Sequence, residues 1–424
     1  MPFCATLYNQ DKFENLTDVI APPFDKITPA ERRFLISRTE YNVSRLIVGQ
    51  EKIDGYYENE FYESVPKLIK KWIRDGILEH TTTPALYYLV QYFQGPDSIC
   101  HIRKGFIALI PIEDYATEKL YPLSRLSDDV IKDRLRLLKA SKTNFNQIFF
   151  AYQDPENRIN KILDEAQTRA IKTLHAEDET NGVRNILYVI QEEDVIQEVQ
   201  SLMATQSALV TDGYFRLETI KQFRDEHIDE TGIDQTDADY TMGYFACTND
   251  FGSKIYPTHR VLHDIPDFSD ILFKEKLKKY FSFYTIDYED IRIDNEDMII
   301  TFVEKDGTVS ELELNNEGKA LLKSRIENPA LSKLDTVILN EIVLKEIMQM
   351  SNETIQNTDS INYHFTLESF WEDIRGNGQA GFILNYPNTT LIYELATNGI
   401  QLPRHTTYFF PKLSTGLVMR EMED

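Results

Sequence analysis

Hydrophobic residues recur along this chain at two spacings, and each spacing predicts a different kind of element. Residues 58–75 carry apolar side chains every three to four residues, with Phe61, Val65, Leu68 and Trp72 as the apolar positions. This spacing is typical of an amphipathic helix. Gly76 follows, and a glycine at this place usually ends a helix because it tolerates a left-handed backbone.

Capping residues mark the starts of other helices. Thr28, Pro29 and Glu31 stand at the spacing of an N-cap, a first-turn proline and a capping-box glutamate, which predicts a helix from residue 29. Helical periodicity or capping also predicts the helices 127–140, 155–172, 192–205, 217–230, 336–350 and 366–375.

Short runs of β-branched and aromatic residues predict strands. Residues 85–93 and 104–112 flank a Gly-Pro-Asp turn signal, so we expect them to pair as an antiparallel hairpin. Residues 298–314 form a second hairpin with Asp306-Gly307 at its turn. Five further strands are predicted at 147–152, 185–190, 207–211, 242–248 and 381–386.

This alternation of strands and helices predicts an α/β or α+β fold, with a mixed sheet and flanking helices. The chain has 424 residues, which is long enough for more than one core. We expect an N-terminal α/β region over residues 1–265 that carries the ligand site, and a C-terminal α+β region over residues 266–424. No linker of biased composition marks that boundary, so a single compact unit is the alternative.

Composition excludes several classes of protein. The formal net charge of −24 disfavours nucleic acid as a partner, because like charges repel. No apolar run is long enough to span a membrane, and the N-terminus lacks the pattern of a signal peptide, so we expect a cytoplasmic protein. The three cysteines and eight histidines show no zinc-site or disulfide spacing. Walker, GxGxxG, GxSxG and HExxH motifs are absent.

The stretch LVTDGYFRL at 209–217 has two interpretations. Asp212 and Gly213 follow a predicted strand and precede a predicted helix, so they can form an ordinary turn. Alternatively, Gly213 lets the backbone approach a ligand, while Arg216 binds phosphate in bidentate fashion at the helix N-terminus. Asp212 would then act on a metal ion or on substrate.

Other polar residues also have a functional and a structural interpretation. Arginines bind carboxylates and phosphates, and carboxylates hold metal ions or accept protons. Structural alternatives are a solvated helix face, a buried histidine and an Asx-turn. The candidates are Asp133 and Arg134 in KDRLRLL, Thr258, His259 and Arg260 in YPTHRVL, Asp25 after Pro22-Pro23, and Asn42 and Arg45 in YNVSRL.

Short stretches along the whole chain resemble the domain-of-unknown-function family 1015. They are APPFD (21–25), YNVSRL (41–46), WIRDGIL (72–78), KGFIALIPIEDY (104–115), DDVIKDRLRLL (128–138), DGYFRLETI (212–220), YPTHRVL (256–262) and TTYFFPKLSTGL (406–417). The family's Asp-Gly-His-His-Arg signature is similar to that of the ParB/sulfiredoxin-like group, which includes free-serine kinases. The resemblance implies a ParB/sulfiredoxin-like core, a site for ATP or ADP with Mg²⁺, and transfer of phosphate to a small hydroxylated metabolite such as serine.

This chain departs from the family pattern at two places. Tyr214 and Phe215 stand where the family has two histidines, and Leu123 and Ser124 stand where it has His and Glu. Neither replacement supplies a neutral-pKa imidazole or a general base.

Three functions therefore stay open. The protein is a nucleotide-dependent phosphotransferase with a diverged active site, a non-catalytic homologue that binds a small anion as a sensor or partner subunit, or an interaction protein with a filled pocket. In the first case Asp212, Asp133 and Asp25 are the catalytic candidates. A homo-oligomer is also left open.

Overall fold

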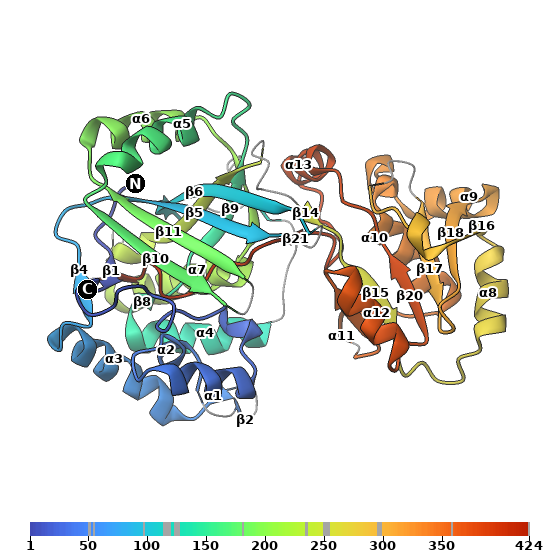
Figure 1. Ribbon diagram of the computed structural model, residues 1–424, viewed down its shortest axis with the longest axis horizontal. Helices are drawn as coiled ribbons and strands as arrows, with labels where there is room; N and C mark the ends of the chain where they lie inside the picture. The colour runs from blue at the N-terminus through green and yellow to red at the C-terminus, as the bar shows by residue number, and fades with distance from the viewer. Residues whose placement is uncertain are drawn as a thin grey trace. The chain divides into compact units, whose positions relative to one another are not determined.

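The structure is a computed structural model that describes residues 1–49, 52–53, 56–95, 98–112, 120–122, 128–179, 182–233, 236–248, 255–294, 299–357 and 359–422 (Figure 1). The chain divides into two compact units. The first comprises Met1–Gly95, Ile99–Ser253 and Pro411–Asp424, and the second comprises Pro96–Ser98 and Lys254–Phe410. Residues 254–265, assigned from the sequence to the N-terminal region, thus lie in the second unit, and the last residues of the chain return to the first.

A mixed sheet forms the centre of the first unit. Within the described residues it has eight strands, in the order β10 (Lys172–Asp178), β11 (Val183–Ile190), β5 (Leu86–Gln94), β6 (Cys100–Pro111), β13 (Tyr240–Cys247), β9 (Ile148–Tyr152), β12 (Ala208–Asp212) and β7 (Leu120–Pro122). The pairs β13–β9 and β12–β7 are parallel, and the others are antiparallel. The predicted α/β class with a mixed sheet and flanking helices is confirmed.

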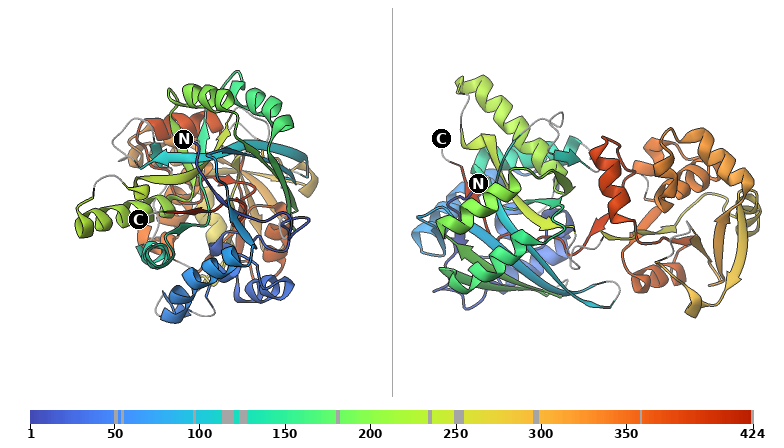
Figure 2. Two further views of the ribbon diagram at one scale, coloured as in Figure 1. Left: turned by 90° about the vertical axis from the view of Figure 1, so that its left-hand side faces the viewer. Right: turned by 90° about the horizontal axis from the view of Figure 1, so that it is seen from above.

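Helices cover this sheet. They are α1 (Pro29–Arg38), α2 (Ser44–Ile47), α3 (Asn59–Arg74), α4 (Asp128–Ser141), α5 (Arg158–Ala166), α6 (Glu193–Met203) and α7 (Tyr214–Thr231). In Figure 1, α5 and α6 lie above the sheet and α1 to α4 lie below it, and Figure 2 shows α5 and α6 side by side. Apolar residues of α4, α5, α6 and α7 join strand residues in one core cluster.

Local signals placed most of these elements correctly. The capping box of α1 is present, because Thr28 Oγ1 accepts from the Glu31 N–H and the Glu31 carboxylate accepts from the Thr28 N–H. The helix α3 forms as predicted, but Tyr62 and Ile69 are buried there in place of Phe61 and Leu68. At two positions, the buried residue of α3 is therefore the neighbour of the predicted one. Hydrophobic periodicity alone does not determine which of two adjacent apolar residues is buried.

The strand β10 was not predicted. Its residues run KTLHAED and bury only Leu174, Ala176 and Asp178 on one side. Few of its residues have high strand propensity, so its identity depends on pairing with β11.

Small sheets attach the chain ends to the first unit. The strand β1 (Thr6–Tyr8) pairs with β4 (Leu78–His80), and β22 (Arg420–Glu421) pairs with β8 (Thr143–Asn144). A bridge between Ala21 and Thr415 joins the N-terminal loop to the C-terminal segment. A further pair is β2 (Lys52–Ile53) with β3 (Tyr56–Tyr57). These contacts bring residues near 24, 144 and 415 together.

The second unit has its own sheet, in which all pairs between described strands are antiparallel. The order is β16 (Phe281–Ile286), β18 (Val309–Leu314), β17 (Ile300–Glu304), β20 (Ala380–Ile383), β15 (His259–Leu262) and β19 (Ile361–His364). The predicted hairpin is confirmed, with Gly307 at a φ of 88° in its turn. The strand β14 (Ile255–Tyr256) pairs separately with β21 (Tyr408–Phe409).

Six α-helices and one π-helix accompany this sheet in the described residues: α8 (Asp270–Lys278), α9 (Asn316–Arg325), α10 (Asp335–Ile338), the π-helix η6 (Leu339–Ile347), α11 (Asn352–Asn357), α12 (Leu367–Arg375) and α13 (Thr389–Thr397). Phe370 and Ile374 of α12 pack against Val261 and Ile383 of the sheet. Across both units, none of the described helices has the length and apolarity to cross a membrane.

Candidate functional site

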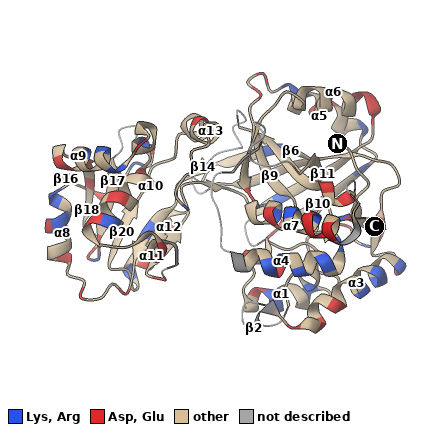
Figure 3. Ribbon diagram, turned by 180° about the vertical axis from the view of Figure 1, so that it is seen from behind, with Lys and Arg blue, Asp and Glu red and all other residues tan. Residues whose placement is uncertain are grey.

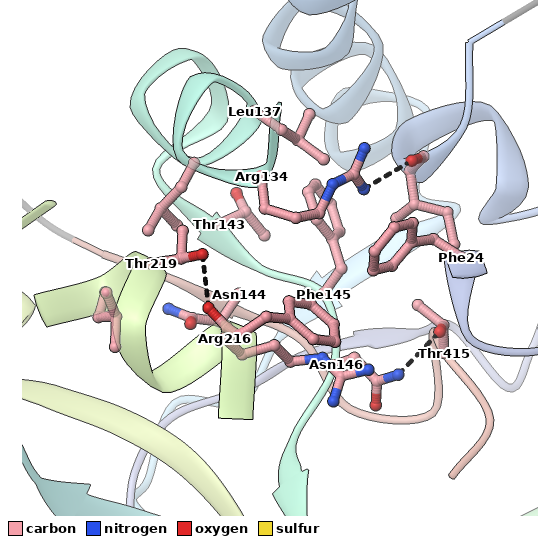
Figure 4. Close-up of a pocket in the computed structure, with 14 residues that line it drawn as sticks. Phe24, Arg134, Leu137, Thr143, Asn144, Phe145, Asn146, Arg216, Thr219 and Thr415 are labelled. Atoms are coloured by element: carbon pink, nitrogen blue, oxygen red, sulfur yellow. Dashed lines mark hydrogen bonds between the residues drawn. The ribbon is translucent and has the colours of Figure 1, made fainter. Parts of the chain in front are cut away.

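A cavity of about 80 Å³ lies in the first unit, next to the helices α4 and α7. Figure 4 shows the residues that line it. They come from five separate parts of the chain: Phe24; Ile47; Arg134, Leu137, Leu138, Thr143, Asn144, Phe145 and Asn146; Phe215, Arg216, Thr219 and Ile220; and Thr415. Two arginines therefore face one largely aromatic and aliphatic cavity.

Arg216 is held at the start of α7. Its Nη1 donates to the Gln147 carbonyl at 3.3 Å and lies 3.8 Å from Asp212 Oδ2. The guanidinium lies 4.6 Å from the centre of the Phe215 ring, and its side chain is 15% exposed. Nε and Nη2 have no hydrogen-bond acceptor within the described residues. Arg216 therefore has donors left for a ligand, and Figure 4 shows it extending towards Asn146.

Gly213 makes this position of Arg216 possible. It is the N-cap residue of α7 and has a φ of 82°, which lies in the left-handed region that favours glycine. A Cβ atom at residue 213 would overlap Arg216 Nη1 and would lie 3.3 Å from Ile148 Cα. The glycine thus serves both the turn and the close approach of the arginine, so the two interpretations of the DGYFR stretch are compatible.

Asp212 is surrounded by positive charge. Lys412 Nζ donates to its Oδ1 at 2.8 Å. Burial opposes ionisation of this carboxyl, but Lys412, Arg216 and Lys26 together hold its pKa below the usual range. Asp212 is therefore ionised at neutral pH. Three cations therefore act on this one carboxylate next to α7.

Arg134 has its charge neutralised by its sequence neighbour. Its Nε and Nη2 donate to Asp133 Oδ2 at 3.0 and 2.6 Å, and its Nη1 donates to the Ile47 carbonyl at 2.9 Å. The guanidinium lies 4.2 Å from the centre of the Phe24 ring, as Figure 4 shows. Arg134 is thus a fixed wall of the cavity more than a free cation.

Asp133 is fully buried and does not line the cavity. Its Oδ1 accepts a 2.5 Å hydrogen bond from the Tyr62 hydroxyl, while Arg134 bonds Oδ2. Burial, together with this bond, raises the pKa of Tyr62. A carboxylate held in this way positions Arg134 and has no open path to a substrate.

Two asparagines that line the cavity were missed by sequence reasoning. Asn144 Nδ2 is buried and has no hydrogen-bond partner within the described residues. Asn146 Nδ2 donates to Thr415 Oγ1 at 3.0 Å (Figure 4). The run NFN at 144–146 alternates polar and apolar residues, which is a strand-like signal. The position of Asn144 depends on the pairing of β8 with the C-terminal strand β22.

Residues 1–337 match the family described as protein of unknown function (DUF1015). The chain belongs to this family. The resemblance inferred from the short sequence stretches is confirmed. Among curated proteins, none matches this sequence.

Solved structures similar to this DUF1015 member share little sequence with it. One is a free serine kinase in complex with AMP, at 12% identity and a TM-score of 0.37, covering 71% of this chain and 86% of the kinase. A conserved hypothetical protein from Pyrococcus furiosus has 12% identity and a TM-score of 0.34, with 72% and 93% covered. SbnI with a C-terminal truncation, from Staphylococcus aureus, has 9% identity and a TM-score of 0.34, with 74% and 81% covered.

The residues at the departures from the DUF1015 pattern differ in placement. Phe215 is buried, lines the cavity and packs edge-on against Phe24, with ring centres 5.3 Å apart. Tyr214 packs against the core cluster instead. Leu123 and Ser124 lie outside the described residues.

The remaining candidates of the first unit lie away from the cavity lining. Asn42 is fully buried, and its Nδ2 donates to the Asp18 and Ile20 carbonyls at 2.8 Å. Its Oδ1 accepts from the Ser44 N–H at 2.9 Å, so Asn42 holds a loop together. Arg45 is half-buried in α2, and its Nε has no partner within the described residues. Asp25 is exposed in the 3-10 helix η1 (Phe24–Lys26).

Thr258, His259 and Arg260 belong to the second unit and are buried there. His259 Nδ1 accepts from the Leu384 N–H at 3.1 Å. Burial, with the nearby Arg260, lowers the pKa of His259 to about 3, so this histidine is neutral. None of these three residues lines the cavity of the first unit.

The described residues contain no group of three or more His, Cys, Asp or Glu side chains that could hold a metal ion. A Mg²⁺ ion at Asp212 would need most of its oxygen ligands from a bound phosphate compound and water.

Proposed function

We propose that the first unit of this DUF1015 member binds a small organic anion in the cavity next to α4 and α7. The observation that carries this proposal is Arg216, which lies at the cavity with Nε and Nη2 uncommitted within the described residues. A guanidinium with adjacent free donors suits a carboxylate or a phosphate, which it binds with two parallel hydrogen bonds.

Local charge supports an anionic ligand. Arg216, Lys412 and Lys26 all act on the single carboxylate of Asp212, while Arg134 and Asp133 cancel. The N–H groups at the start of α7 add a positive potential. Lys, Arg, Asp and Glu are interspersed along helices α1, α3, α4 and α7 (Figure 3), so Arg216 and its immediate surroundings supply the local attraction for an anion.

The size of the cavity limits what it encloses. A volume of about 80 Å³ corresponds to roughly six water-sized spheres, whereas pockets for drug-sized ligands have about 300–1,000 Å³. A phosphate or short carboxylate group fits within it, with the rings of Phe24 and Phe215 against an apolar part of the ligand. The larger part of a nucleotide would lie outside.

A phosphotransferase is the second candidate, because Asp212, Gly213 and Arg216 place a carboxylate and a cation at a helix N-terminus. Phosphoryl transfer needs positioned cations and a residue that orients or deprotonates the acceptor hydroxyl. Asp133 is fully committed to Tyr62 and Arg134, and Lys412 bonds Asp212. We therefore place anion binding ahead of catalysis.

Ligand binding is tested by thermal unfolding with inorganic phosphate, O-phosphoserine, AMP, ADP and ATP. A ligand at a hundred times its Kd stabilises by about 2.7 kcal/mol, which raises Tm by about 5–10 °C in a domain of this size. Arg216→Gln should abolish the shift. Arg224→Gln is the matched control, because Arg224 lies on the same helix but bonds Asp225 and the Ile112 carbonyl. If the thermal shift persists in both variants, Arg216 is not part of the site.

Product analysis separates binding from catalysis. With ATP, Mg²⁺ and serine, a binding protein yields no phosphoserine above the level of Arg216→Gln. Phosphoserine formation that Arg216→Gln and Asp212→Asn both abolish would instead establish the phosphotransferase.

A further inference from the structure

The second unit contains a larger cavity of its own, of about 540 Å³. All the residues that line it belong to this unit, and they include Arg260, Asn340, Lys345, Tyr363 and His405. Its volume lies in the range of small-molecule sites, about 300–1,000 Å³. It is therefore large enough for a metabolite, including one of nucleotide size.

Arg260 is the unusual residue of this cavity. It is 2% exposed, and no carboxylate within the described residues forms an ion pair with it. Its Nη1 donates to the Thr258 carbonyl, and its Nη2 donates to the His405 carbonyl at 3.0 Å. A guanidinium has five N–H donors, so three of them have no acceptor within the described residues. Burial lowers the pKa of Arg260 to about 10, which still leaves it charged at neutral pH.

An uncompensated buried charge is costly in a folded protein, because its hydration is lost without a partner. Two other cations that line this cavity, unlike Arg260, do have carboxylate partners among the described residues. Arg325 forms an ion pair with Glu346, and Lys345 forms one with Glu341. Arg260 thus retains a positive charge that the described protein groups do not balance, and such groups in cavities are typical of ligand sites.

The surroundings hold Arg260 in a fixed position. Its guanidinium lies 4.6 Å from the centre of the Tyr363 ring, and that ring stacks on His405 with centres 3.9 Å apart. His405 has a φ of 57°, an uncommon left-handed conformation for a residue other than glycine. The backbone carbonyl that Arg260 bonds therefore comes from a strained residue, and strain of this kind gathers at ligand sites.

The π-helix η6 supplies another part of the lining, through Asn340, Glu341 and Lys345. Such helices are rare and occur often at functional sites. This feature is independent of the charge on Arg260, and both features meet at one cavity.

We propose that this cavity is a second, separate ligand site, which binds a phosphate- or carboxylate-bearing metabolite through Arg260. Three donors of a planar guanidinium, held by Tyr363 and two carbonyls, match the oxygens of either group. The site does not depend on the anion site of the first unit.

Calorimetric titration of full-length Arg216→Gln protein tests the proposal without the first site. The probes are inorganic phosphate, pyrophosphate, AMP and citrate, so that phosphate and carboxylate recognition are distinguished. We expect one binding event per chain with at least one probe. Its Kd should rise roughly 10- to 100-fold when Arg260→Met is added, since a charge-assisted bond is lost. Absence of binding by all four probes at millimolar concentration would overturn the proposal.

Arg260→Met also reports on its structural role. Removal of an uncompensated buried charge should leave the unliganded Tm unchanged or higher, whereas a purely structural arginine would lower it. If Arg260→Met does not fold, Asn340→Asp provides the test, because it adds a negative charge to the lining at constant size. We expect about tenfold weaker binding. Arg292→Met is the control and should leave Kd within about twofold, because Arg292 is exposed outside the cavity lining and donates to the Glu289 and Ile291 carbonyls. Unchanged binding in Asn340→Asp would contradict the proposal.

Discussion

Replacement of Gly213 by alanine is the sharpest test of how the first-unit site is built. The left-handed φ of 82° costs an L-residue about 1–2 kcal/mol. In addition, the new Cβ overlaps Arg216 Nη1, so the guanidinium must leave the Gln147 carbonyl. Loss of that hydrogen bond adds about 1 kcal/mol. We therefore expect Gly213→Ala to lower the free energy of unfolding by about 2–3 kcal/mol.

Gly232→Ala is the matched control for this variant. Gly232 caps the other end of α7 with a φ of 69°, but a Cβ there meets no atom within 4 Å. Gly232→Ala should lower the free energy of unfolding only by the cost of a left-handed backbone at alanine, about 1–2 kcal/mol. Its affinity for the anion should not change. Urea unfolding measures the stability of both variants, and titration with the ligand found by thermal shift measures affinity. Equal stability and equal affinity in the two variants would refute the overlap with Arg216.

Further predictions concern buried titratable groups. Because the folded-state pKa of Asp212 is lowered, its bond to Lys412 stabilises above the unfolded pKa and is lost as pH falls through the folded pKa. Asp212→Asn should therefore lower the free energy of unfolding by about 1–3 kcal/mol at pH 7 and by less at pH 3, as measured by urea unfolding. His259 is neutral in the folded protein, with a pKa of about 3. As the pH falls from 6.5 to 5, the histidine takes up a proton only in the unfolded state, so the free energy of unfolding of the second unit should fall by about 2 kcal/mol. His259→Gln should flatten that dependence in pH-dependent melting curves. Tyr62→Phe leaves the buried Asp133 one hydrogen bond short, and should lower stability by about 1–3 kcal/mol in chemical denaturation; an unchanged midpoint would contradict that bond.

Local sequence signals determined most elements of this protein. The Thr28 capping box, the Asp306-Gly307 turn and the paired strands β5 and β6 all form as predicted, because each depends on residues close together in the chain. Gly213 and Arg216 are in the same category, since four residues of backbone bring them together. The short stretches that resemble DUF1015 also identified the family, because each consists of consecutive residues.

Tertiary structure decided which candidate side chains share a site. Arg134 and Arg216 line one cavity because α4 and α7 pack together, but the burial of Asp133 beside Tyr62 neutralises Arg134. Arg260 belongs to another unit and is left without a carboxylate partner among the described residues. Charge compensation depends on which groups folding brings within a few ångströms, and linear spacing does not encode those distances between remote segments. The sequence alone therefore specified the residue types, and packing specified which cations remain available to an anion.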